Sequence, residues 1–152
     1  MSVIKTYDFF PGNCLFDSTA FLIPAWKGNG RGLRASAIKW TENQLVLGKS
    51  DWVTSISNNY HHYDYYGKHT YQEYLEHIRN MSVYAATVGL YMLSNFLEVG
   101  IVLYSSSYQR IVENETRFVP NMQFASAFET RINLFYDPIM EHYEPIIVII
   151  NN

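Results

Sequence analysis

The stretch FFPGNCLFDSTAFL, residues 9–22, contains the only cysteine of the chain and decides how its N-terminal part is interpreted. The triplet PGN in front of Cys14 is a turn signal, and the apolar residues behind it recur as on a helix until Pro24 ends the run. The pattern predicts a short buried helix over 14–23 that begins at Cys14. The cysteine is then either a small core residue or a nucleophile, because the amides at a helix N-terminus favour a thiolate and a developing oxyanion.

Length and composition restrict the class of protein. A chain of 152 residues with 48% hydrophobic and 16% charged residues suits a single globular domain over 1–152. The net charge of -3 provides no general basic field, so we expect no nucleic-acid partner. The chain has a single cysteine, no signal-like features in its first ten residues and no apolar run of about 18 residues. These features predict a cytoplasmic monomer without a membrane segment.

The rest of the chain divides into helices followed by strands. Helical spacing of apolar residues predicts helices over 33–47, 71–80 and 85–99, and a capping-box pair, Thr70 and Glu73, opens the second of them. Beyond Gly100, β-branched and aromatic runs predict strands over 101–105, 108–114, 116–119, 132–136 and 143–150. A turn from Asp137 to Glu141 should join the last two strands as a hairpin. The order predicts an α+β domain with N-terminal helices packed on a mainly antiparallel sheet of about five strands.

A catalytic cysteine needs a base, and His142 is the best placed of the five histidines. It opens the last predicted strand, and a residue on a rigid strand is aimed more accurately than one in a loop. Glu144 lies two residues further on and therefore points to the same face of the strand, where it would fix the imidazole tautomer. A solvated strand edge with no catalytic role is the alternative interpretation of this pair.

The remaining histidines raise the question of a metal site. The candidate ligands lack a cysteine pair or a His-x-x-x-His spacing on a helix, so we predict no metal and no other cofactor. These candidates are His61, His62, Asp64, His69 and His77.

Three blocks of the sequence resemble one known family. PGNCLFDSTA (11–20) is similar to the nucleophile motif of ovarian tumour (OTU) family cysteine proteases, and YAATVGLYMLSNFLEVGIVLYS (84–105) is similar to their middle block. HYEPI (142–146) resembles the closing motif, in which His-Tyr precedes a carboxylate or amide residue and an apolar strand. The blocks occur in the family's order across nearly the whole chain, and the compact OTU proteases of viruses and intracellular bacteria are the most similar members.

The resemblance implies a papain-like OTU fold and a thiol-dependent deubiquitinase. Its substrate would be the bond after the C-terminal glycine of ubiquitin or a ubiquitin-like modifier, and its own polyprotein is a second expected substrate. The family motifs assign Cys14 as nucleophile, His142 as general base and then acid, and Glu144 as the orienting carboxylate. If the protein is viral or a bacterial effector, the expected location is the host cytosol. A module that binds ubiquitin without turnover is the alternative.

The resemblance also places the oxyanion hole and the substrate channel. The hole falls on Gly12 and Asn13 with the amide of Cys14, but Pro11 replaces the family's aspartate and has no N–H to donate. The channel for the modifier's Gly-Gly tail falls on the residues where the family has Trp-Gly-Gly and on the tyrosine after the histidine, and aromatic walls would admit only glycines. These channel residues are Tyr84, Ala85, Ala86 and Tyr143, and core packing is the alternative role of the two tyrosines.

Overall fold

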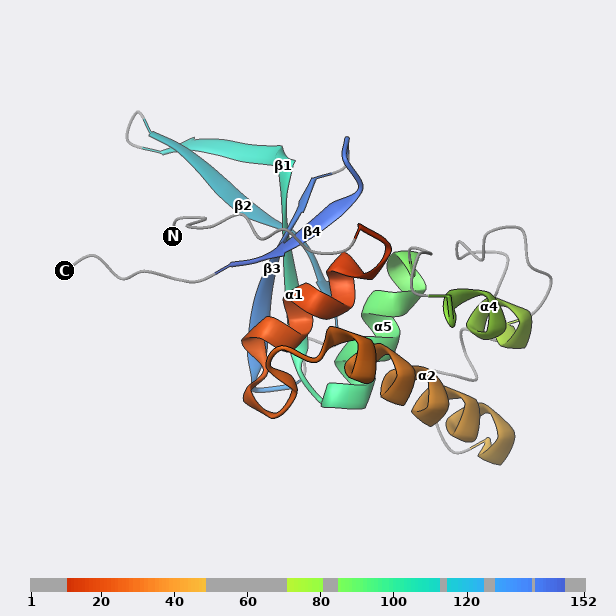
Figure 1. Cartoon of the computed structure of the whole chain (residues 1–152). Coiled ribbons are helices and arrows are strands. Elements are labelled where there is room, and N and C mark those ends of the chain that lie inside the picture. Colours follow the sequence, from red (N-terminus) through yellow and green to blue (C-terminus); the bar gives the residue numbers. More distant parts are fainter. Residues whose placement is uncertain are drawn as a thin grey trace.

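The structure is a computed structural model, and it describes residues 11–48, 71–80, 85–112, 115–124, 128–137 and 139–146. Within these ranges four α-helices precede a four-stranded sheet (Figure 1). The predicted α+β class and the order of helices before strands are confirmed.

The first helix, α1 (Cys14–Leu22), begins at the cysteine as the sequence predicts. A short 3-10 turn, η1 (Pro11–Asn13), leads into it, and a second one, η2 (Pro24–Trp26), follows it. Six of the residues in α1 are buried, so the helix lies inside the molecule. Its mostly apolar sequence is therefore explained by packing on more than one side.

Helix α2 (Gly30–Leu47) starts three residues earlier than the apolar spacing predicts. The reason is its N-cap, because the side chain of Asn29 accepts a hydrogen bond of 3.0 Å from the N–H of Gly32. The helix ends at Gly48, whose φ of 59° is left-handed and suits glycine.

The other two helices also agree with the predicted segments. Helix α4 (Tyr71–Ile78) covers most of 71–80, and α5 (Ala86–Leu97) covers most of 85–99. The predicted cap Thr70 lies outside the described residues. Helix α5 ends at Glu98, which adopts a left-handed φ of 54°, and the next residue donates its N–H to the carbonyl of Ser94. The chain then turns directly into the first strand.

The sheet has the order β2-β1-β3-β4, formed by β1 (Gly100–Val112), β2 (Glu115–Phe124), β3 (Arg131–Asp137) and β4 (His142–Pro145). Two of its pairings are antiparallel, and the central one between β1 and β3 is parallel. The predicted break between 105 and 108 is wrong, because β1 runs on with only a register irregularity there. Merging these two segments gives four described strands where the sequence predicted about five.

The predicted turn between the last two strands is confirmed. The carboxylate of Asp137 accepts hydrogen bonds from the amides of Ile139 (3.0 Å) and Met140 (3.3 Å), which is how an aspartate stabilises a tight turn. Asp137 then pairs with His142 in the antiparallel ladder. The turn therefore fixes the register of β4 and hence the position of His142.

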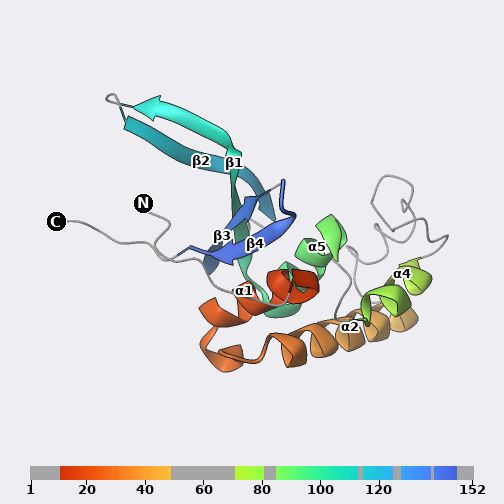
Figure 2. The ribbon, with the colours of Figure 1, turned by 45° about the horizontal axis from the view of Figure 1, so that its top comes forward.

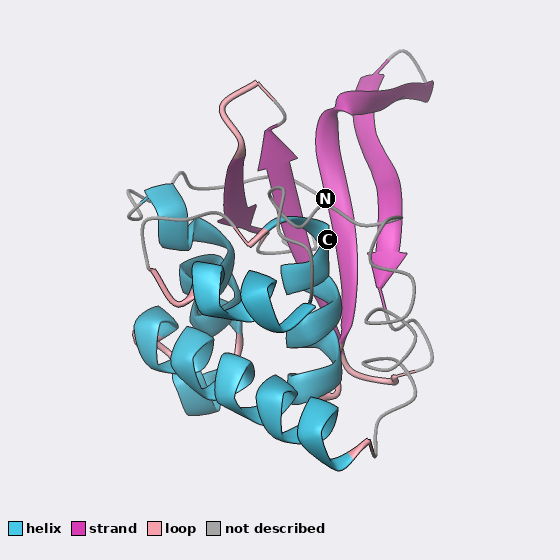
Figure 3. Ribbon diagram, turned by 90° about the vertical axis from the view of Figure 1, so that its right-hand side faces the viewer, coloured by secondary structure: helices cyan, strands magenta, loops and turns pink. Residues whose placement is uncertain are grey.

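The helices form one layer and the strands form the other (Figure 3). Helices α1 and α5 contact the strands, α2 packs on both of these helices, and α4 packs on α2. The β1–β2 pair extends well beyond the helices (Figure 2). One hydrophobic cluster joins the helices to the inner face of β1 and β3 and to Tyr143. Among the described residues, no helix is both long and apolar enough to cross a bilayer.

Candidate active site

Cys14 lies at the junction of the two layers. It is the first residue of α1, it is fully buried, and its Sγ accepts a hydrogen bond of 3.5 Å from the backbone N–H of Tyr143 in β4. The two residues are 129 positions apart in the chain. The fold therefore brings the nucleophile motif and the closing motif into direct contact.

The backbone of Tyr143 is held by α1 at both of its polar groups. Its N–H points at Cys14, and its carbonyl accepts a hydrogen bond of 2.9 Å from the buried hydroxyl of Ser18, one turn further along the helix. β4 is the last strand in the sheet order, so its outer edge would otherwise carry unpaired backbone groups. Side chains of α1 satisfy these groups and lock the strand against the helix.

His142 and Glu144 lie on the opposite face of β4 from the side chain of Tyr143, as strand alternation requires. Nε2 of His142 is 3.5 Å from Oε1 of Glu144, and both side chains are partly buried. With Nε2 facing Glu144, the other ring nitrogen, Nδ1, is the one left for a reacting group. The residue before the histidine, Glu141, has a left-handed φ of 50°, which turns the chain sharply into β4.

Burial dominates the electrostatics of the thiol. It raises the pKa of Cys14 above the ordinary value, although hydrogen bonds from the amides of Tyr143, Leu15 and Cys14 itself lower that pKa. The nearby charge of Asp17 raises it further. The expected position at the helix N-terminus is correct, but burial outweighs the amide hydrogen bonds and favours the neutral thiol. A base must take its proton when a substrate arrives.

The loop before the cysteine is compact and internally bonded. Asn13 is fully buried, and its side-chain amide donates a hydrogen bond of 3.0 Å to the carboxylate of Asp17. Burial raises the pKa of Asp17, while the bond from Asn13 and the charges of Arg31 and Arg34 lower it. The residues predicted for the oxyanion hole are consecutive and all buried: Gly12 and Asn13 lie in this loop, and Cys14 begins α1.

Sequence reasoning missed one residue of this region, Arg34 of α2. It is fully buried, and its guanidinium contacts the loop at the carbonyl of Gly12 (Nη1 to O, 2.8 Å) and at Oδ1 of Asn13 (Nη1, 3.3 Å). A signal was present in the sequence, because Arg34 occupies the same helical stripe as the buried residues Ala37 and Ile38. A charged residue on a buried stripe indicates a specific partner.

The predicted channel residues are only partly described. Tyr84 lies outside the described residues, and Ala86 is the first residue of α5. Ala85 is buried, and its carbonyl accepts a hydrogen bond from the hydroxyl of Tyr74. Tyr143 is 7% exposed, and its ring packs against that of Tyr136, with ring centroids 4.7 Å apart. Tyr143 is thus part of the hydrophobic cluster, and its role in a substrate channel stays a prediction.

Among the described residues, no three His, Cys, Asp or Glu side chains lie close enough together to hold a metal ion. Of the candidate ligands, His77 lies in α4, and His61, His62, Asp64 and His69 lie outside the described residues.

The chain belongs to the OTU-like cysteine protease family, whose model matches residues 11–143. The match begins at the turn before Cys14 and ends just after His142, so it includes both sides of the contact between α1 and β4. No curated protein matches the sequence.

Solved structures of OTU proteins have the same fold at low sequence identity. The viral OTU domain protease of Dera Ghazi Khan virus superposes with a TM-score of 0.62 at 16% identity, covering 95% of this chain and 80% of that one. The Hazara virus OTU bound to ubiquitin gives a TM-score of 0.54 at 19% identity, covering 96% and 81%. An OTU deubiquitinase from Wolbachia pipientis wMel bound to ubiquitin gives 0.53 at 17% identity, covering 90% of each chain.

Proposed function

We propose that this chain is a deubiquitinase that hydrolyses the bond after the C-terminal glycine of ubiquitin or a ubiquitin-like modifier. The observation that carries the proposal is the hydrogen bond from the backbone N–H of Tyr143, the residue directly after His142, to Sγ of Cys14. Membership of a cysteine protease family supports the class of reaction. Two neighbours of the same fold, from Hazara virus and Wolbachia, are solved with ubiquitin bound, which supports the substrate.

In the first half of the reaction, His142 takes the proton of the Cys14 thiol. The thiolate attacks the carbonyl carbon of the modifier's last glycine, a sulfur–carbon bond forms, and the carbonyl π electrons move to oxygen. The amides of Gly12, Asn13 and Cys14 are the donors for this oxyanion. The protonated His142 then gives its proton to the leaving amine, and the carbon–nitrogen bond breaks to leave a thioester.

In the second half, water hydrolyses the thioester. His142 takes a proton from the water, the hydroxide attacks the thioester carbonyl, and the thiol leaves with the proton from His142. The carboxylate of Glu144 accepts a hydrogen bond from Nε2–H of His142 throughout, which holds the ring in one tautomer. All three side chains therefore take part in both halves.

The test is hydrolysis of ubiquitin that carries a fluorogenic amine at its C-terminus. We expect turnover by the wild type and none by Cys14→Ala, while both proteins bind ubiquitin with similar affinity. Binding by both proteins without turnover by either would instead support the noncatalytic ubiquitin-binding module. Equal residual turnover in the two proteins would contradict the role of Cys14.

The cellular setting belongs to the same proposal. The proposed place of action is the cytosol of a host cell, with the protein's own polyprotein as a proposed second substrate. Incubation of a longer parent chain with and without the Cys14→Ala change would test self-cleavage.

A further inference from the structure

Arg34 joins two parts of the molecule that are distant in sequence. On one side its Nη1 donates to the loop before Cys14, which we call the oxyanion loop (Pro11–Asn13), at the carbonyl of Gly12 and at Oδ1 of Asn13. On the other side, Nε and Nη2 donate to the carbonyl of Ile78 (2.9 and 2.7 Å), and Nη2 also donates to the carbonyl of Asn80 (3.0 Å). The end of α4 therefore anchors the guanidinium, and the guanidinium holds the loop.

The contact with the carbonyl of Gly12 also fixes the direction of the N–H of Asn13. The carbonyl of Gly12 and the N–H of Asn13 belong to one planar trans peptide, so they point in opposite directions. Because Nη1 of Arg34 donates to the carbonyl of Gly12, the N–H of Asn13 points away from the guanidinium. A charged donor on the carbonyl also polarises the peptide and makes its N–H a stronger hydrogen-bond donor.

We propose that Arg34 is a positioning residue that orients and polarises the Asn13 amide as a donor to the oxyanion. This proposal rests on the proposed function, in which Gly12, Asn13 and Cys14 supply these donors. It also accounts for Pro11, which has neither a carboxylate nor an N–H to support the loop. In this chain the support comes from α2 instead.

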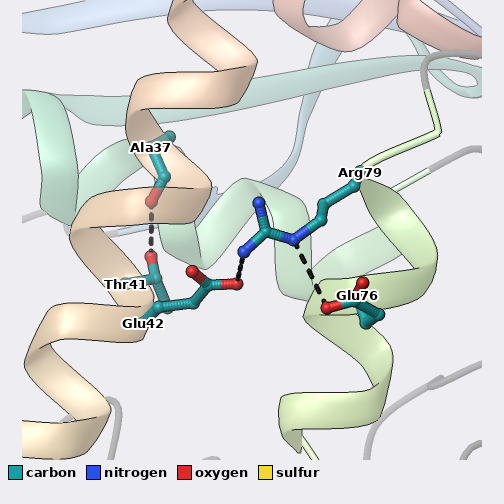
Figure 4. Close-up of polar contacts among 5 residues, drawn as sticks. All are labelled: Ala37, Thr41, Glu42, Glu76 and Arg79. Carbon is teal, nitrogen blue, oxygen red and sulfur yellow. Dashed lines mark hydrogen bonds and ion pairs between the residues drawn. The ribbon is translucent and has the colours of Figure 1, made fainter.

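A second arginine provides a matched control. Arg79 also connects α4 with α2, through ion pairs with Glu42 of α2 and with Glu76 at 3.5 Å (Figure 4). Its side chain is about half exposed. Both arginines link the same two helices, but only Arg34 also contacts the oxyanion loop. Arg34→Lys and Arg79→Lys therefore separate support of the loop from support of the helix pair.

Two ubiquitin probes distinguish the proposed role from a general loss of structure. A ubiquitin aldehyde reacts when sulfur bonds to the carbonyl carbon, the π pair moves to oxygen and the thiol proton ends on that oxygen, so it needs the oxyanion donors. A ubiquitin with a C-terminal 2-bromoethyl group reacts when sulfur bonds to carbon and bromide leaves with its electron pair, while His142 takes the thiol proton. The second reaction uses the same thiol and the same base but forms no oxyanion.

We expect Arg34→Lys to weaken the aldehyde adduct about 10²-fold, the usual loss for one oxyanion donor, and to leave alkylation by the bromoethyl probe within about 3-fold. Arg79→Lys should change both reactions little. If Arg34→Lys does not fold, Asn13→Ala removes one loop contact of Arg34 and leaves its bonds to Ile78 and Asn80. Asp17→Ala removes the other side-chain contact of Asn13 and is its control.

Equal losses with both probes, or no loss with either, would overturn the positioning role. Amide hydrogen exchange tests the same role without a substrate. If Arg34 holds the loop, Arg34→Lys should raise exchange at residues 12–14 by about 10-fold or more, and Arg79→Lys should not. Unchanged exchange in Arg34→Lys would contradict the proposal. A wild type that reacts with neither probe would contradict the proposed function instead, and the exchange result would still decide the role of Arg34.

Discussion

The N–H of Tyr143 points at Sγ of Cys14 from 3.5 Å, and the two residues come from opposite ends of the chain. This contact couples the start of α1 to β4, and β4 carries His142 and Glu144. The arrangement of the site therefore depends on how firmly the helix holds the strand.

Ser18 is the first test of that coupling. Ser18→Ala removes the donor to the carbonyl of Tyr143 and leaves a buried acceptor without it, which should cost about 1–3 kcal/mol of unfolding free energy. Turnover should fall as well, because β4 loses one of its two bonds to α1. Urea unfolding and steady-state hydrolysis measure both effects.

Thr19→Val is the matched control for this substitution. Thr19 is buried beside Ser18, but its hydroxyl donates back to the carbonyl of Leu15 within the same helix. We expect its effect on turnover to be small. An equal fall in turnover for both variants would mean that the hold of α1 on β4 does not matter for the site.

The raised pKa of Cys14 predicts a pH dependence of stability. The folded protein keeps the thiol protonated to higher pH than the unfolded chain does, so the unfolded state releases this proton first as the pH rises. Stability should therefore be lost above the ordinary thiol pKa of about 8.5 and should keep falling until the raised folded pKa is passed.

Urea unfolding of wild type and Cys14→Ala between about pH 7 and 10 isolates this effect. Burial also raises the pKa of Tyr104, which is present in both proteins. Burial raises the pKa of Tyr136 and the charge of Cys14 raises it further, so this coupling is part of the measured difference. We expect the wild type to lose stability relative to Cys14→Ala above about pH 8.5, which is the ordinary pKa of a thiol. Parallel curves would show that the thiol is not held in its neutral form.

Glu144 should matter for turnover more than for binding. Glu144→Ala removes the acceptor 3.5 Å from Nε2 of His142, and we expect kcat to fall about 10²-fold with KM nearly unchanged. Glu144→Gln keeps an oxygen acceptor and should lose only about 10-fold. Glu129→Gln, at an exposed site before β3, should behave as wild type. A raised KM with normal kcat in Glu144→Ala would assign this residue to binding instead.

Gly30 tests the packing of α1 on α2. A Cβ at this position would lie 2.0 Å from Oδ1, 2.7 Å from Cα and 2.8 Å from N of Asp17, so the backbone of α1 would have to move. We expect Gly30→Ala to cost about 1–3 kcal/mol in thermal or urea unfolding. Gly48→Asn, in an open left-handed position, should cost much less. Equal stability of the two variants would show that the helices do not approach this closely.

Local patterns predicted the elements that carry the site. The turn before Cys14, the apolar run to Leu22 and the Asp137 turn act over a few residues, and the structure confirms all three. The sequence does not predict the continuity of β1, because a break in side-chain pattern resembles the register irregularity that the strand contains.

Long-range contacts account for what the sequence could not show. The partners of Arg34 are mostly backbone oxygens more than 20 residues away, and backbone groups leave no pattern in a sequence. The same holds for the bonds from α1 to Tyr143. The pKa of Cys14 depends on burial, which follows from the assembled core and not from its neighbours in the chain. The central parallel pairing of β1 with β3 is likewise a property of the assembled sheet.

The most direct test of the central claim is intact mass spectrometry after incubation with ubiquitin that carries an electrophile at its C-terminus, with Cys14→Ala alongside. We expect wild type to gain the mass of one ubiquitin probe and Cys14→Ala to gain none. That result would establish the nucleophile and recognition of the ubiquitin tail together. A folded wild type that forms no adduct, or an adduct that also forms with Cys14→Ala, would contradict the assignment of this chain as a deubiquitinase acting through Cys14.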